Sequence, residues 1–322
     1  MTRVLFLAER TEIPDEQIEP HGSSAHVAST LAALRARFDV LAIGPEPGQE
    51  APSTHPAIHA FVPARVRGLR RDFAFARADR AFAHRALAAA AAFEPDVVYE
   101  RDEYFALAGR RVARRLGVPL VLEVNGLLAA DARTMYRSLA EQLGAVIERK
   151  KLHRADAVVT VSPGLAERLV ALGAPRARVT VVPNTVGEER LAPVVREASE
   201  DTVVVGWIGH LMDWHADALL RLVEVAPGVV AEADVRFRVI GDGPRLEEVR
   251  ELARVLGVAD RFDFVGSVEY DDVPRALTSI DVGVIPDVFD YAFPVKLVEM
   301  GAAGLPVVAP RSASLDAQLV PG

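Results

Sequence analysis

The sequence predicts an α/β protein that contains two doubly wound, Rossmann-like sheets. Short runs rich in β-branched residues alternate with alanine- and leucine-rich stretches of helical period, the pattern of parallel strands covered by helices on both faces. A length of 322 residues exceeds the usual size of one hydrophobic core. A polar, acidic stretch without periodicity interrupts the series at residues 187–201, and we interpret it as a linker between two domains.

The first domain is predicted over residues 1–186 and the second over residues 202–322. Candidate strands of the first are residues 4–8, 39–43, 96–99, 120–124, 157–161 and 179–182, and candidate helices are residues 25–37, 74–93, 105–116 and a long one that ends near residue 154. The second has candidate strands at residues 203–208, 235–240, 262–265, 282–285 and 306–309, and candidate helices at residues 216–225, 245–256 and 273–278. Ligands of such sheets bind outside the carboxyl ends of the strands, so we expect the strand-end loops of both domains to face a cleft.

Composition and charge exclude several classes of protein. The absence of cysteine excludes disulfides and cysteine zinc sites, and it fits a reducing, cytoplasmic location. The apolar run near Met1 is too short for a signal peptide or a membrane span. A net charge of −8 disfavours nucleic-acid binding. The chain has no P-loop, nucleophile elbow, His-Glu-x-x-His helix or complete dinucleotide fingerprint.

A basic, aromatic stretch at residues 65–85 is the local exception to the acidic composition. It contains Arg65, Arg67, Arg70, Arg71, Arg77, Arg80 and Arg85, with Phe73, Phe75 and Phe82 between them and only Asp72 and Asp79 as acids. One interpretation is a surface for an anionic partner or for the inner face of a membrane. The other is a solvated helix face, and both interpretations stay open.

Residues 294–309 are the most informative segment. Pro294 suits the first turn of a helix and Gly304 suits the residue after its end, so a short helix is predicted before a buried strand. The start of that helix would offer free amides and a positive dipole to a pyrophosphate. Lys296 adds a cation, and Glu299 could accept hydrogen bonds from a ribose diol. A packing helix with two solvated charges is the alternative.

The chain resembles the family 4 glycosyltransferases, retaining enzymes of the GT-B fold, along nearly its whole length. Residues 294–309 look like the family's P-x-K-L-x-E element, whose glutamate holds the nucleotide ribose. Residues 22–26 look like the glycine-rich loop that faces the donor phosphates. Further similar segments follow in the family's order at residues 123–126, 155–162, 182–184, 241–246, 264–274 and 281–286.

This resemblance implies a hexosyltransferase-type enzyme that moves a sugar from a nucleoside diphosphate sugar to an unknown hydroxyl acceptor. It implies retention of configuration, no bound metal, no further cofactor and no nucleic-acid partner. The catalytic residues implied are His26, Asn125 and Lys296. The donor-binding residues implied are Gly22, Ser23, Gly209, His210, His215, Gly243, Val265, Tyr291, Pro294, Val295, Lys296, Leu297 and Glu299.

The sequence also departs from the family pattern. The family commonly has two glutamates with seven residues between them, and counting back from Glu299 reaches Tyr291. The arginine and lysine that usually grip the pyrophosphate are missing, and His215 stands at the lysine position. His215 could instead be buried against Trp214, and His26 could equally be a buried residue at a helix start.

Family members usually continue past the strand at residues 306–309, so we expect an incomplete, truncated second domain and reduced or absent activity. Two other functions stay open. One is a nucleotide-sugar epimerase of the same fold, which would change the donor sugar without an acceptor. The other is a non-catalytic nucleotide-sugar-binding module, which Tyr291 favours.

Overall fold

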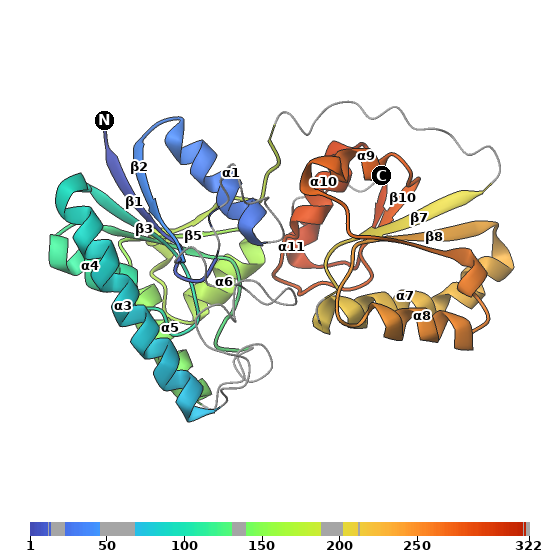
Figure 1. Cartoon of the computed structure of the whole chain (residues 1–322), viewed down its shortest axis with the longest axis horizontal. Coiled ribbons are helices and arrows are strands. Elements are labelled where there is room, and N and C mark those ends of the chain that lie inside the picture. The colour runs from blue at the N-terminus through green and yellow to red at the C-terminus, as the bar shows by residue number, and fades with distance from the viewer. Residues whose placement is uncertain are drawn as a thin grey trace. The chain divides into compact units, whose positions relative to one another are not determined.

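The computed structural model describes residues 1–11, 13, 23–45, 68–130, 140–187, 202–211, 213–317 and 319. Its contacts divide the chain into two compact units, which we call unit 1, ending at Pro183, and unit 2, beginning at Asn184 (Figure 1). The predicted linker lies outside the described residues apart from Gly187, so its structure stays a prediction.

Unit 1 contains a six-stranded parallel sheet in the order β2-β1-β3-β4-β5-β6. Its strands are β1 (Arg3–Leu7), β2 (Asp39–Ile43), β3 (Val97–Arg101), β4 (Leu120–Val124), β5 (Ala157–Thr160) and β6 (Val179–Val181). Its helices are α1 (Ser23–Arg35), α3 (Leu69–Phe93), α4 (Ala108–Leu116), α5 (Glu141–Arg154) and α6 (Pro163–Ala171). Leu5 and Leu7 of β1 pack with α3 and α4, whereas Phe6 packs with α1, so helices cover both faces.

Unit 2 contains a five-stranded parallel sheet in the order β11-β10-β7-β8-β9. Its strands are β7 (Val203–Ile208), β8 (Val235–Ile240), β9 (Phe262–Gly266), β10 (Val282–Val284) and β11 (Val307–Val308). Its helices are α7 (Asp213–Glu232), α8 (Leu246–Val255), α9 (Val273–Leu277), α10 (Val295–Ala302) and α11 (Ala313–Asp316). The predicted α/β class with two parallel sheets is confirmed.

Two helix boundaries and one unpredicted helix differ from the prediction for identifiable reasons. Helix α7 continues through Pro227, because Leu222, Val223 and Ala226 are buried in the core of unit 2 and this packing outweighs the proline. Helix α4 begins at Ala108 and not at residue 105, since Phe105 has a left-handed φ of 62°. Helix α6 was not predicted, although Ser162 caps it by accepting a hydrogen bond from the Leu165 amide at 3.0 Å.

The arginine-rich stretch at residues 65–85 does not form one continuous surface. Arg65 and Arg67 lie outside the described residues, and the part from Leu69 onward belongs to α3. Arg71, Phe75 and Phe82 of that helix are buried. The guanidinium groups of Arg10 and Arg71 lie 4.4 and 5.3 Å from the ring centroid of Phe75, which explains how Arg71 is accommodated. In the described part, the exposed side chains of the stretch include Arg70, Phe73, Arg77 and Arg80.

None of the described helices combines the length and the apolar composition that a membrane-spanning segment requires.

Candidate active site

Closely packed glycines form the floor of the site in unit 2, at the carboxyl ends of β7 and β8. The Gly209 amide donates to the carbonyl of Ile240 at 3.0 Å, and the Gly241 amide donates to that of Gly266 at 2.7 Å. A Cβ on Gly241 would lie 1.8 Å from the Gly209 carbonyl oxygen, and one on Gly243 would lie 2.6 Å from the Leu211 carbonyl oxygen. The backbones therefore approach more closely than any other residue would allow.

Gly241→Ala is expected to destabilise unit 2 by about 3 kcal/mol, because φ is 133° and the added methyl group meets a backbone oxygen. Urea unfolding followed by tryptophan fluorescence measures this, since Trp207 and Trp214, the only tryptophans, both belong to unit 2. Gly228→Ala is the control: a Cβ there meets nothing within 4 Å, and the variant is expected to gain up to about 1 kcal/mol. Equal unfolding midpoints would contradict the tight approach.

Lys296 lies directly over this glycine floor. Its ammonium group is 4.5 Å from the centroid of the Trp207 ring and 2.7 Å from the point where a Cβ on Gly209 would lie. Burial lowers the pKa of Lys296 to about 8, and the charge of Glu299 opposes that shift. Because few water molecules solvate this ammonium group, a bound anion would stabilise its charge.

Helix α10 directs Lys296 and Glu299 to one side. Leu297 is 3% exposed and packs with Ile285 and Phe293, which anchors the opposite side of the helix in the core. Residues three apart in a helix share a face, so the lysine and the glutamate lie together. No side chain of a described residue caps the first turn. The Leu297 amide donates to the Pro294 carbonyl at 3.1 Å, so the amides of Val295 and Lys296 are the candidates for an anion.

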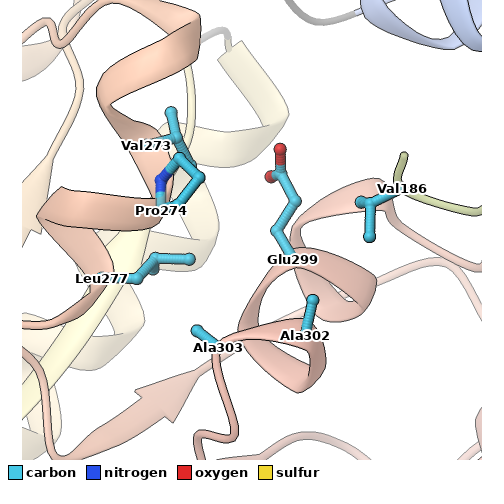
Figure 2. A pocket seen from close by; sticks show the side chains of 7 residues that line it. All are labelled: Val186, Val273, Pro274, Leu277, Glu299, Ala302 and Ala303. Atoms are coloured by element: carbon cyan, nitrogen blue, oxygen red, sulfur yellow. The ribbon is translucent and has the colours of Figure 1, made fainter. Parts of the chain in front are cut away.

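The Glu299 side chain projects into a small surface hollow in unit 2. Figure 2 shows its carboxylate between α9, which contributes Val273 and Pro274, and the segment that contains Val186. The remaining lining residues are Leu277, Ala302 and Ala303. The hollow thus combines apolar walls with one carboxylate, which suits a ribose diol.

The other predicted donor residues fall into three groups. Val295 opens α10, Val265 is exposed at the end of β9, and His210 is exposed beside the glycine floor. Tyr291 is 8% exposed and stacks on Phe289 at a centroid distance of 5.4 Å. The last group is Gly22, Ser23 and His215: Gly22 lies outside the described residues, and for Ser23 in α1 and His215 in α7 only the helical backbone is described.

Unit 1 brings the predicted residues His26 and Asn125 together on one carboxylate. The Nε2 atom of His26 lies 2.7 Å from Oε1 of Glu123, and the Asn125 amide donates to the same oxygen at 2.5 Å. Arg101 also donates to it, at 3.2 Å. Glu123 is the second-last residue of β4 and is paired in register with Arg101 of β3, and α1 supplies His26 from the neighbouring layer.

Glu123 is ionised at neutral pH despite being 3% exposed. Burial alone would raise its pKa, but the hydrogen bonds from His26 and Asn125 and the charge of Arg101 outweigh burial and lower the pKa to about 2. Burial and the same carboxylate raise the pKa of Tyr99. The carboxylate also takes part in a side-chain hydrogen bond with Tyr99, so Glu123 is the centre of a closed polar group.

Sequence reasoning missed Glu123 and Arg101 as members of this group. The available signal was an acidic residue inside the apolar run at residues 120–124, since a carboxylate in a buried strand requires partners. Over the described residues, no group of three or more histidine, aspartate or glutamate side chains is arranged to hold a metal ion.

Comparisons with known proteins agree with this architecture. The family model described as Glycosyltransferase Family 4 matches residues 20–190, and the one described as Glycosyl transferases group 1 matches residues 202–320. The chain is 34% identical over 219 residues to a 2-deoxystreptamine N-acetyl-D-glucosaminyltransferase of Streptomyces fradiae, covering 60% of this chain and 50% of that protein. It is 30% identical over 219 residues to a 2-deoxystreptamine glucosyltransferase of Streptomyces kanamyceticus, covering 63% and 55%.

The solved structure of Anabaena Alr3699/HepE in complex with UDP-glucose is similar, with a TM-score of 0.65, 17% identity, and coverage of 99% of this chain and 83% of that one. The fold is therefore that of the GT-B glycosyltransferases. The chain belongs to glycosyltransferase family 4, as the sequence motifs predicted. It spans about half the length of the curated relatives that it matches.

Proposed function

We propose that the chain transfers a sugar from a nucleoside diphosphate sugar to a hydroxyl group, with retention of configuration and without a bound metal. The observation that carries this proposal is the ammonium group of Lys296, which lies over the Trp207 ring above the glycine floor. Departure of a diphosphate leaves negative charge, which a preorganised cation and free helix amides stabilise. We also propose a cytoplasmic location, because a chain without cysteine fits a reducing compartment.

For the donor, Lys296 and the first amides of α10 are our candidates for holding the diphosphate. Glu299 in its hollow is the candidate for accepting hydrogen bonds from the ribose. The similar Anabaena structure was solved with UDP-glucose, which supports a nucleotide-sugar donor. Because that similarity is at 17% identity, the base and the sugar are left to measurement.

For the acceptor, we propose a hydroxyl group of a cyclitol. Two relatives act on 2-deoxystreptamine, a ring that carries hydroxyl and amino groups. In unit 1, the polar group that His26 forms with Glu123, Asn125 and Arg101 is our candidate for the acceptor side. His26, held by Glu123, is our candidate for a group that touches the reacting hydroxyl or sugar.

Calorimetry with a panel of nucleoside diphosphates tests the donor site and identifies the base. Incubation of a labelled sugar donor with 2-deoxystreptamine then tests transfer, and the anomeric configuration of the product tests retention. Activity that survives a chelator supports metal independence. A donor sugar that changes without any acceptor would favour an epimerase, and binding without consumption of the sugar would favour a non-catalytic module.

Glu299→Gln is expected to weaken the affinity for a nucleoside diphosphate about 30-fold, because a hydrogen bond to a charged acceptor is worth roughly 2 kcal/mol. The turnover number at saturating donor should change less than about threefold. Glu269→Gln is a matched control, since Glu269 is an exposed carboxylate of the same unit outside the hollow. Calorimetry measures the affinity, and loss of turnover with unchanged affinity would contradict the ribose role.

A further inference from the structure

The outer helices of unit 1 direct their acids inward and their bases outward. Asp72 and Asp79 of α3 and Glu148 of α5 are at most 8% exposed. Asp79 pairs with Arg111 of α4 and accepts a hydrogen bond from the Leu107 amide at 2.6 Å. These acidic side chains therefore lie inside the unit, and their negative charges do not offset the positive charges on the outer surface of the helices.

The exposed cations of these helices form what we call the basic face. Its members are Arg70, Arg77 and Arg80 of α3, Arg114 and Arg115 of α4, and Arg149, Lys150 and Arg154 of α5. No aspartate or glutamate of α3, α4 or α5, whose residues are all described, is exposed. This contrasts with a net charge of −8 for the whole chain.

The three helices belong to one side of the sheet. Phe82 of α3 and Val112 of α4 share a core cluster with β1 and β3, and Phe75 of α3 shares another with Ile147 of α5. Burial lowers the pKa of Arg110, and the charges of Arg154 and Arg114 lower it further, so the cations of α4 and α5 lie within reach of each other. The basic face therefore gathers the cations of α4 and α5 near each other, on the same side of the sheet as the arginines of α3.

Large apolar side chains are exposed in the first turns of two of these helices. Leu69 is 60% exposed and Phe73 is 77% exposed in α3, and Leu143 is 53% and Val146 is 44% exposed in α5. The core cluster that joins Phe75 to Ile147 brings these turns together. Exposing a phenylalanine and neighbouring aliphatic side chains to water costs free energy. Such a cluster is typical of a surface that binds a partner or a membrane.

We propose that the basic face docks onto an anionic lipid surface. Phe73 and Leu69 enter the boundary between headgroups and acyl chains, while Arg70, Arg77 and Arg80 contact lipid phosphates. Charge complementarity fits any polyanion, but the exposed aliphatic residues Leu69, Leu143 and Val146 fit a membrane interface and offer no stacking face to a base. The inference does not depend on the proposed transfer reaction.

Co-sedimentation with vesicles tests this inference. The chain is expected to bind phosphatidylglycerol-containing vesicles at low salt, to leave them as salt rises, and to ignore pure phosphatidylcholine vesicles. With about a fivefold contribution per cation, Arg70→Gln, Arg77→Gln and Arg80→Gln together lose roughly 100-fold in vesicle affinity. Phe73→Ser is expected to lose roughly 10-fold.

Matched controls remove the same groups from unit 2. Exposed Arg236, Arg254 and Arg311 changed together to glutamine, and Val255→Ser at a side chain that is 70% exposed, should bind vesicles like the parent. Donor consumption without vesicles should be the same in all variants, which separates this inference from the proposed function. Equal loss in the two triple variants, absence of binding to anionic vesicles, or tighter binding to duplex DNA than to vesicles would overturn it.

Discussion

Replacing Lys296 by methionine is expected to lower kcat about 1,000-fold while weakening diphosphate affinity only about 10-fold. The ammonium group sits over Trp207 and beside the backbone of Gly209, where little water screens it. The charge on a departing diphosphate grows as the bond to the sugar breaks, so the lysine acts mainly in the transition state. Steady-state kinetics with the donor and calorimetry with UDP separate the two effects.

The affinity of the chain for a diphosphate should also depend on pH through Lys296. Burial lowers the pKa of Lys296 to about 8 in the free protein, whereas a bound diphosphate favours the charged form. Binding therefore takes up a proton above about pH 8, and diphosphate affinity should fall there by up to about tenfold per pH unit. Lys296→Arg is the control, because a guanidinium stays charged and its profile should be flat. A flat profile in the parent would contradict the buried cation.

The sequence predicted a strand or helix correctly where the residues of that element alone show its pattern. The predicted strands at residues 39–43, 120–124, 203–208 and 235–240 coincide with β2, β4, β7 and β8, because each is a short segment rich in valine, isoleucine, leucine or phenylalanine. Helix α7 was predicted too short, since the proline and glycine at residues 227 and 228 are stop signals in sequence and only tertiary packing outweighs them.

Residue spacing alone predicted the candidate site only on one helix, whereas His26 and Asn125 were predicted from the family resemblance. Lys296 and Glu299 are three residues apart, so helical geometry alone places them on one face. The role of Glu123 depends on the pairing of β3 with β4 and on the packing of α1, which join His26 to residues 97 positions away. Such long-range contacts leave no local pattern in the sequence.

Glu123→Gln is expected to lower kcat by roughly 100-fold with little change in donor affinity. The carboxylate accepts hydrogen bonds from Asn125 and Arg101 and contacts His26, so its charge fixes the orientation of all three side chains. A neutral amide offers one acceptor and adds two donors, which disrupts that arrangement without changing the volume of the side chain. We therefore assign Glu123 as a positioning residue for His26.

A double-variant cycle separates positioning from a merely structural role. If Glu123 acts through His26, combining Glu123→Gln with His26→Gln should cost little more than the worse single change. Glu148→Gln is the matched control, since it replaces another buried carboxylate of unit 1 and should leave kcat within about twofold. Additive losses of kcat in the cycle, or an equal loss of kcat in the control, would mean that Glu123 only stabilises the unit. Independent effects on folding add, whereas effects through one shared group do not.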